Sequence, residues 1–200
     1  MSTEAYNLFP QRVVAHDCDF FYAYRQRLID YAYYLRSHFD SQIYTVHKGW
    51  QSPQDVKERE DFRQFVPFFD WNIRQCFVHY GFDLQKVGYR LEICVFNIGA
   101  PGSYHFSHVH PKCDISSVLW IQSPENCGRL VFENPDGFSQ TPIIEHLEQK
   151  KRDEIKTGSK YFFDPKEGCM LLFPPNLSHY VEENQSNDHR ISVVFNFKFI

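Results

Sequence analysis

The sequence predicts a mainly β domain, a sandwich or jelly roll, that follows a helical N-terminal layer. Apolar residues recur at helical spacing in the first third of the chain, and from Val87 onward they alternate with period two. The 200 residues are enough for one domain with a sizeable hydrophobic core. We therefore expect a single domain over residues 1–200, with the helical layer at about 1–86 and the jelly-roll core at about 87–200.

The first predicted helix lies between Phe21 and Leu35. Its apolar side chains repeat every three or four positions, which places them on one face of a helix. Asp17 and Asp19 stand near the expected start and are available to cap it. We expect the aromatic face of this helix to pack against a sheet.

A second helical region follows. The segment Ser52–Asp55 offers an N-cap, a proline at the first helical position and an acidic third residue. Apolar residues at helical spacing then run to Tyr80, and Gly81 ends the pattern. Pro67 interrupts it, which predicts either a kink or a separate second helix that opens at this proline.

Short segments with period-two alternation are predicted as strands in the rest of the chain. Glycine, proline and asparagine separate them, including a predicted turn at 99–102, and this spacing is typical of a sandwich or jelly roll. The polar stretch 141–159 is predicted as an exposed excursion. The expected strands cover residues 87–98, 104–110, 115–122, 128–133, 160–163, 168–173, 178–183 and 190–199.

Composition and charge exclude several classes of protein. The net charge is -4 and the pI about 6.2, so the chain has no basic field for nucleic acid. The aromatic content of 18% argues against a disordered chain. No export signal or membrane-spanning stretch is visible, and the six cysteines form no CxxC pair. We therefore expect reduced thiols, a cytoplasmic protein, and neither a nucleic-acid nor a membrane partner.

Three histidines are the candidate metal ligands. His108 and His110 stand one residue apart, so on an extended strand their side chains share a face. His179 comes from a distant strand and leaves the opposite side of a bound ion open, as in the facial triad of non-heme iron oxygenases. Neutral imidazoles suit Fe(II), and they also suit zinc, copper and nickel. We predict a mononuclear iron site.

Arg190 and Ser192 are the candidate anion-binding residues. They share one face of the last predicted strand, which is otherwise largely apolar. A guanidinium and a hydroxyl together suit a carboxylate. A charge in an apolar strand needs a partner, and a bound anion would supply it; a surface salt bridge is the alternative. Tyr104 and Trp120 are expected either to line the cavity or to belong to the core.

Three further residues stand close to the histidines in the sequence. His105 alternates to the opposite strand face from His108 and is therefore a weak ligand candidate. Asp114, or a water molecule, is an alternative to His110 as the third ligand. Cys113 either lines the site or fills a small space in the core.

Taken in order, these motifs resemble the 2-oxoglutarate–Fe(II) oxygenases of bacteria and marine phages. The resemblance implies a double-stranded β-helix with N-terminal helices, and Fe(II) and 2-oxoglutarate as cofactors; it names no substrate. It spans residues 49–197 and rests on Gly49-Trp50-Gln51-Ser52, Pro101-Gly102-Ser103-Tyr104, His108-Val109-His110-Pro111, the run from Gly168 to Pro174, His179 and Arg190-Ile191-Ser192.

The resemblance implies a dioxygenase that uses molecular oxygen to hydroxylate an unidentified small-molecule or peptide substrate. His108, His110 and His179 would hold Fe(II), while Arg190 and Ser192, with Tyr104 beside them, would bind 2-oxoglutarate. The wider superfamily has HxD or HxE where this chain has HxH. Two alternatives therefore stay open: a three-histidine dioxygenase that does not use 2-oxoglutarate, and a jelly-roll binding module, metal-free or zinc-bound, that is not catalytic.

Overall fold

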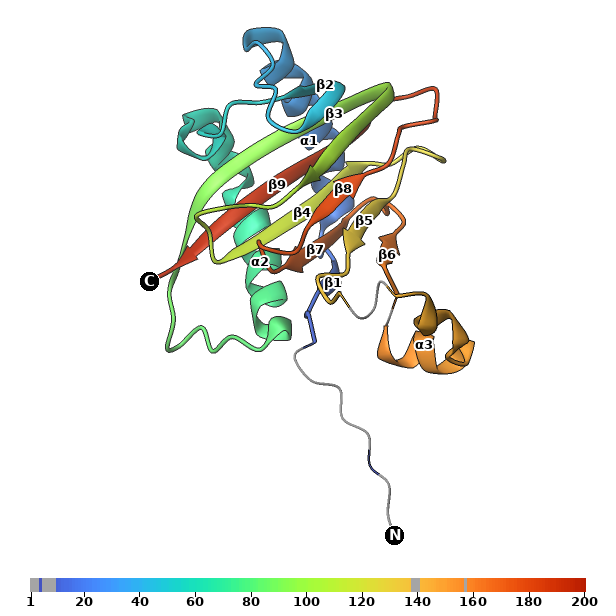
Figure 1. Ribbon diagram of the computed structural model, residues 1–200. Helices are drawn as coiled ribbons and strands as arrows, with labels where there is room; N and C mark the ends of the chain where they lie inside the picture. The colour runs from blue at the N-terminus through green and yellow to red at the C-terminus, as the bar shows by residue number, and fades with distance from the viewer. Residues whose placement is uncertain (1–3, 5–9, 138–140, 157) are drawn as a thin grey trace.

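Two helices cover one face of a curled antiparallel sheet in the computed structural model (Figure 1). The structure describes residues 4, 10–137, 141–156 and 158–200. The helices are α1, Phe21–His38, and α2, Val66–Tyr80. The predicted mainly β architecture with N-terminal helices packed on the sheet is confirmed.

The strands form one sheet that bends into a half-barrel. Its order is β1-β7-β4-β9-β3-β8-β5-β6, and β2 also pairs with β3. Each pairing between strands is antiparallel. The strands are β1 Val14–Asp17, β2 Val46–Gln51, β3 Tyr89–His108, β4 Ile115–Gln122, β5 Leu130–Glu133, β6 Lys160–Phe163, β7 Cys169–Phe173, β8 His179–Val181 and β9 Arg190–Phe199.

Strand β3 connects the two parts of the curled sheet. Its first part pairs with β9, from Tyr89↔Phe199 to Gly99↔Arg190, and its last part pairs with β8. The prediction of two strands separated by a turn at 99–102 was wrong. The chain bends there without reversing, because β2 pairs with β3 on both sides of the bend.

The two faces of the sheet bury different cores. Odd-numbered residues of β9, such as Val193 and Phe195, pack with the aromatic faces of α1 and α2. A second, smaller core fills the inside of the barrel and contains Trp120, Phe132 and Phe173. Alternation along each strand therefore sends one set of side chains to the helices and the other to the barrel interior.

Pro67 lies in the first turn of α2, so the prediction of a separate second helix that opens at this proline is confirmed. Gly81 ends the helix with a positive φ of 111°. The cap predictions were wrong. No described side chain caps α1, and Asp19 instead accepts a hydrogen bond from Trp71 Nε1 at 3.0 Å. Ser52 is buried and binds the backbone N–H of Phe96 at 3.0 Å, so it holds β3 instead of a helix.

The first third of the chain also contributes two strands that the helical prediction missed. Strand β1 pairs with β7 at one edge of the sheet, and β2 pairs with β3. Short 3-10 helices, Val56–Glu58 and Glu60–Phe65, stand where the sequence predicted the second helix start. Local periodicity could not reveal either strand, because each is completed by a partner far along the chain.

The segment after β5 lies on the outside of the barrel. It contains a 3-10 helix, Pro142–His146, and helix α3, Gln149–Ile155, which stands beside β6 and has no buried residue (Figure 1). Apart from the buried Ile144, its described residues are largely exposed, in agreement with the predicted surface excursion. Among the described helices, none is both long and apolar enough to cross a membrane.

The aromatic layer between the helices and the sheet is expected to dominate stability. Phe195 is fully buried, and its ring meets that of Phe69 edge to face at 4.8 Å. Phe195→Ala should lower the free energy of unfolding by about 3–5 kcal/mol, because it removes buried area and leaves a cavity. Urea denaturation measures this. Tyr22→Ala, at a side chain that is 79% exposed, is the control and should change it by less than about 1 kcal/mol.

Candidate metal centre and anion pocket

The structure brings the three predicted histidines together at one end of the barrel. His108 ends β3 and lies opposite His179, the first residue of β8, in the antiparallel ladder. His110 follows two residues after β3, and its Nε2 lies 3.2 Å from Nε2 of His179. One ligand atom from each of the three imidazoles lies within 4.8 Å of the others. The cluster has the size of a mononuclear metal site.

Backbone carbonyls fix the orientation of two of these imidazoles. Nδ1 of His108 lies 2.7 Å from the carbonyl oxygen of Phe106, and Nδ1 of His179 lies 2.8 Å from that of Leu177. A carbonyl only accepts, so in both rings the proton is on Nδ1 and the lone pair is on Nε2. The Nε2 lone pairs of both rings are therefore free for a metal ion, the arrangement that is common in histidine metal sites.

Burial also keeps the imidazoles uncharged. Desolvation lowers the pKa of His110 to about 4 and that of His179 to about 3, and it lowers the pKa of His108 as well. All three rings are consequently neutral at pH 7, which is the form that binds a metal. The donor set fits Fe(II) and other divalent ions that accept imidazole.

A carboxylate ties together the two strand segments that carry His108 and His179. Oε2 of Glu133 accepts hydrogen bonds from Ser107 Oγ and Ser178 Oγ, each at 2.6 Å. The two serines immediately precede the histidines in the sequence. This bridge holds β3 and β8 beside β5 next to the candidate ligands His108 and His179, and no sequence pattern indicates it.

His105 faces the same interior side of β3 as His108, whereas the sequence predicted the opposite side. The register shifts between His105 and His108, so strict alternation fails and His105 is buried close to Arg190, His108 and His179. Desolvation, followed by the positive charge of Arg190, lowers its pKa well below the usual range. The prediction that His105 points away from the site was therefore wrong. Its Nδ1 lies 3.0 Å from Thr45 Oγ1.

Arg190 is a buried cation without an acidic partner. Its residue is only 4% exposed, and its Nη1 donates to the backbone carbonyls of Cys127 and Glu182. Its Nη2 has no hydrogen-bond partner, and no carboxylate in the described part of the chain lies within ion-pair distance. Burial lowers the pKa to about 10, so the group still carries its charge at pH 7. The alternative of a surface salt bridge is excluded, and the site fits an anion.

The other predicted residues take separate places. Ser192 shares the interior face of β9 with Arg190 and lies between Asn97 and Trp120 in the sheet. Trp120 is buried in the barrel core. Tyr104 packs against His47 and Phe106, with ring centroids 4.8 Å and 5.2 Å away, and its role in binding a cofactor stays a prediction.

Asp114 and Cys113 do not join the histidine cluster. Oδ2 of Asp114 accepts from the backbone N–H of Phe199 at 2.9 Å, and its other oxygen lies 3.8 Å from Lys198 Nζ. Cys113 Sγ donates to the carbonyl oxygen of His110 at 3.2 Å. Cys113 therefore contacts the backbone of His110 and not its imidazole.

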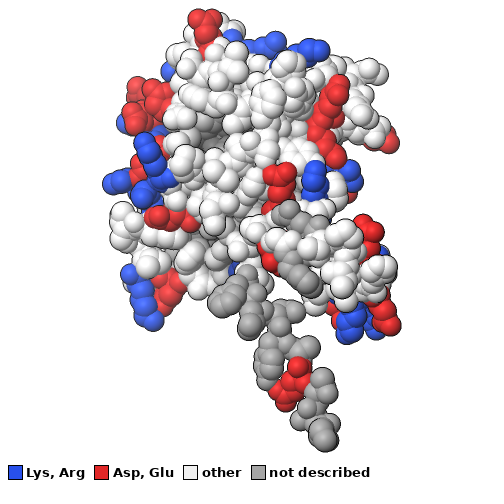
Figure 2. Space-filling model, viewed as in Figure 1, with Lys and Arg blue, Asp and Glu red and all other residues white. Residues whose placement is uncertain are grey.

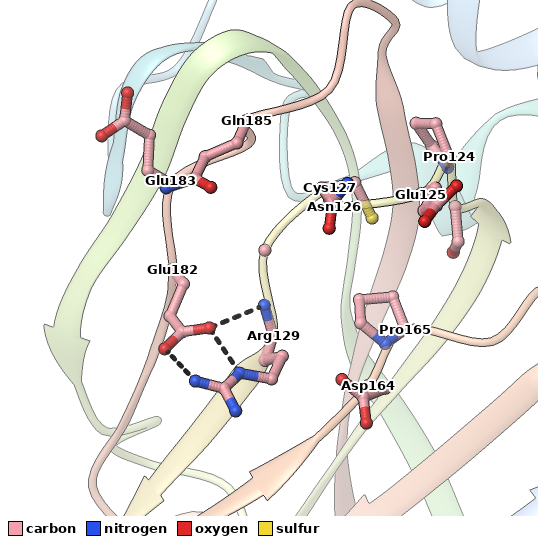
Figure 3. Close-up of a pocket in the computed structure, with 12 residues that line it drawn as sticks. Pro124, Glu125, Asn126, Cys127, Arg129, Asp164, Pro165, Glu182, Glu183 and Gln185 are labelled. Carbon is pink, nitrogen blue, oxygen red and sulfur yellow. Dashed lines mark hydrogen bonds and ion pairs between the residues drawn. The ribbon is translucent and has the colours of Figure 1, made fainter.

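A polar cavity of about 610 Å³ lies next to the loop between β4 and β5 (Figure 3). Arg129 spans part of its wall and is held by both carboxylate oxygens of Glu182, at 2.7 Å and 2.9 Å. Cys127, whose carbonyl binds Arg190, is also part of the lining. Two of its lining residues, Cys127 and Glu182, bind Arg190 through their carbonyls, but none of the three clustered histidines lines this cavity.

Residues 94–196 match the model of a family described as "Putative 2OG-Fe(II) oxygenase". The matched range includes all three histidines, Arg190 and Ser192. No curated protein matches the chain.

Solved structures of low sequence identity share the fold. A prolyl-4-hydroxylase from Pseudomonas putida is 16% identical with a TM-score of 0.62, over 93% of this chain and 91% of that one. A 2OG-Fe(II) oxygenase family oxidoreductase from Burkholderia pseudomallei is 14% identical with a TM-score of 0.64, over 93% and 84%. HygX from Streptomyces hygroscopicus, with nickel, 2-oxoglutarate and hygromycin B bound, is 8% identical with a TM-score of 0.64, over 94% and 83%.

These neighbours identify the curled sheet as the jelly roll of the 2-oxoglutarate oxygenases, so the predicted double-stranded β-helix is confirmed. The family match covers the strands of the barrel from β4 to β8, with most of β3 and β9. The chain belongs to the 2OG-Fe(II) oxygenase family, whose members are oxidoreductases that use Fe(II) and 2-oxoglutarate.

Proposed function

We propose that this oxygenase holds Fe(II) between His108, His110 and His179, binds 2-oxoglutarate against Arg190 and Ser192, and hydroxylates an unidentified substrate. The observation that carries the proposal is the pairing of two features inside one barrel. Three neutral imidazoles converge on one point, and a buried guanidinium, linked to them through His105, has no acidic partner among the described residues.

Each residue has a distinct share in the reaction. Fe(II) and 2-oxoglutarate supply the oxidising chemistry when bound, with molecular oxygen as the oxidant. The carbonyls of Phe106 and Leu177 orient the Nε2 atoms of two ligands. Arg190 orients the cosubstrate through its distal carboxylate. The rings of Phe132 and Phe173 pack against His179 with centroids 5.6 Å and 5.0 Å away, and they exclude water from that side.

The substrate is proposed to be a small molecule or a peptide. One structural neighbour, a prolyl hydroxylase from Trichoplax adhaerens, is in complex with a peptide fragment, and HygX binds hygromycin B. Phe106 and Val109, which are close to His108 in the sequence, are half exposed, so apolar side chains are accessible on the segment that carries His108. Lysine and arginine alternate with acidic residues on the face in Figure 2, which does not favour nucleic acid as partner.

Two further proposals concern the protein as a whole. All six cysteines are free thiols, which supports a cytoplasmic location. We also propose that residues 1–200 form one domain, because α1 and α2 contribute to the same hydrophobic core as β3, β4, β7 and β9.

A second candidate function is a three-histidine dioxygenase that does not use 2-oxoglutarate. The observation that favours it is His110, an imidazole at the position where the wider superfamily has a carboxylate. In that enzyme Arg190 would hold a carboxylate of the substrate itself. The variants below separate the two candidates.

Removal of one histidine should abolish tight metal binding. His108→Ala and His179→Ala each leave two ligands, and an open three-ligand site does not tolerate this loss. Anaerobic equilibrium dialysis against Fe(II) measures the stoichiometry. His146→Ala, at an exposed histidine of the excursion, is the control and should bind iron like the wild type. Normal iron content in either ligand variant would disprove the triad.

Arg190→Ala should weaken 2-oxoglutarate binding ten- to hundredfold, since one charge-assisted buried hydrogen-bonded pair contributes about 1.5–3 kcal/mol. Arg190→Lys keeps the charge without the planar fork and should give an intermediate affinity. Calorimetric titration of the metal-loaded protein measures it. Arg74→Ala removes a half-exposed arginine of α2 and is the control. Equal affinity in Arg190→Ala and the wild type would contradict the assignment.

His110→Asp tests the third ligand. It creates the commoner set of two histidines and one carboxylate, whose charge supports iron oxidation. The variant is expected to keep Fe(II) and to form succinate from 2-oxoglutarate, without a prime substrate, at least as fast as the wild type. Loss of iron from a normally folded variant would favour the three-histidine dioxygenase, and oxygen uptake without 2-oxoglutarate would then be the decisive measurement.

A further inference from the structure

Two buried polar groups that lack partners meet at Gly99. Ser103 Oγ and Arg190 Nη2 are both buried, and neither has a hydrogen-bond partner within the described chain. A Cβ on Gly99 would lie 2.6 Å from Ser103 Oγ and 3.3 Å from Arg190 Nη2. The hydroxyl and the guanidinium are therefore close neighbours, and the missing side chain of Gly99 leaves them room.

We propose that Ser103 Oγ is a further donor to the distal carboxylate of 2-oxoglutarate, beside Arg190 Nη2 and in addition to Ser192, and that Gly99 keeps this subsite open. The inference rests on the proposed function and adds two residues to it. Both unpaired groups donate hydrogen bonds, whereas an ionised carboxylate only accepts, through two oxygens. One carboxylate would thus satisfy two buried donors whose unpaired state is costly.

The backbone around Ser103 is already fixed. Asn184, which is 1% exposed, donates its backbone N–H to the carbonyl of Ser103 and accepts from the N–H of Gly102, both at 2.7 Å. Its side-chain Nδ2 donates to the carbonyls of Gly99 at 3.0 Å and Asp188 at 2.8 Å. These bonds hold the bend of β3 against the loop that leads into Arg190. The backbone that carries Ser103 is therefore already ordered, so binding would cost little backbone ordering.

The decisive variant is Ser103→Ala. Titration of the nickel-loaded protein, which holds the site without turnover, should show about tenfold weaker 2-oxoglutarate binding. Binding of nickel itself should not change. The same variant without ligand should unfold at a higher temperature than the wild type, because it lacks the unpaired buried hydroxyl. A residue with only a structural role would not combine lower affinity with higher stability.

Ser117→Ala is the matched control. Ser117 on β4 is as fully buried as Ser103, and its hydroxyl also has no partner in the described structure. Its replacement should raise the unfolding temperature in the same way and leave 2-oxoglutarate affinity at the wild-type value. Weaker binding in Ser117→Ala would show that loss of a buried hydroxyl acts on the site indirectly, and this would overturn the inference.

A second ligand localises the effect to the distal carboxylate. 2-Oxopentanoate has the same keto acid end and chain length but lacks that carboxylate, so its affinity should be equal in the wild type and in Ser103→Ala. Gly99→Ala places a methyl group in the subsite and should weaken 2-oxoglutarate more than 2-oxopentanoate. Equal losses for the two ligands would contradict a role at the distal end.

The outcomes also separate this inference from the proposed function. Failure of 2-oxoglutarate to bind the wild type would remove the proposed function and the inference with it. If Arg190→Ala and Ser192→Ala weaken binding while Ser103→Ala does not, the cosubstrate site stands and Ser192 is its second donor. Only weaker binding in Ser103→Ala, with Ser117→Ala unchanged, supports the assignment of Ser103.

Discussion

The course of β3 is the constraint on which the other parts of the structure depend. One strand pairs with β9 under the helices and then with β8 at the mouth of the barrel, so a single bend decides where both halves meet. Hydrogen bonds of Asn184 hold that bend in place. A bulge near the end of β3 turns both His105 and His108 to the interior. The candidate metal ligand His108 and the anion-binding candidate Arg190 come together because β3 carries one and pairs with the other, on the two sides of one bend.

The electrostatics of the barrel interior follow from this geometry. Three imidazoles are neutral because burial disfavours their protonation, while the guanidinium of Arg190 keeps its proton. Among the described residues no carboxylate joins the three histidines, so a bound divalent ion would add positive charge to an interior that already contains Arg190. Under the proposed function a dianionic cosubstrate would complement both charges, with one end at the metal and the other at the arginine.

The sequence predicted the parts of the candidate site that short spacing and polarity control. The spacing of His108 and His110 was sufficient to predict that their side chains meet, although His110 lies two residues beyond β3, and the apolar surroundings of Arg190 were sufficient to predict a buried charge. Features that depend on irregular backbone or on distant residues were not predicted from the sequence. The bulge after His105 breaks the alternation, and the unpaired state of Ser103 is a property of its tertiary surroundings. The strands β1 and β2 became recognisable only with their distant partners, because a short segment has no strong preference of its own.

The position of β9 has a consequence for how the protein folds. This strand is the last in the chain, yet it lies between β3 and β4, with pairs as distant as Tyr89↔Phe199 and Ile115↔Phe197. Its contacts close long loops, so sheet formation has a high contact order and belongs to the slow class of folding reactions. Until β9 inserts, β3 and β4 expose the edges that it will cover, and a transient intermediate at this stage is the species most prone to edge-to-edge association.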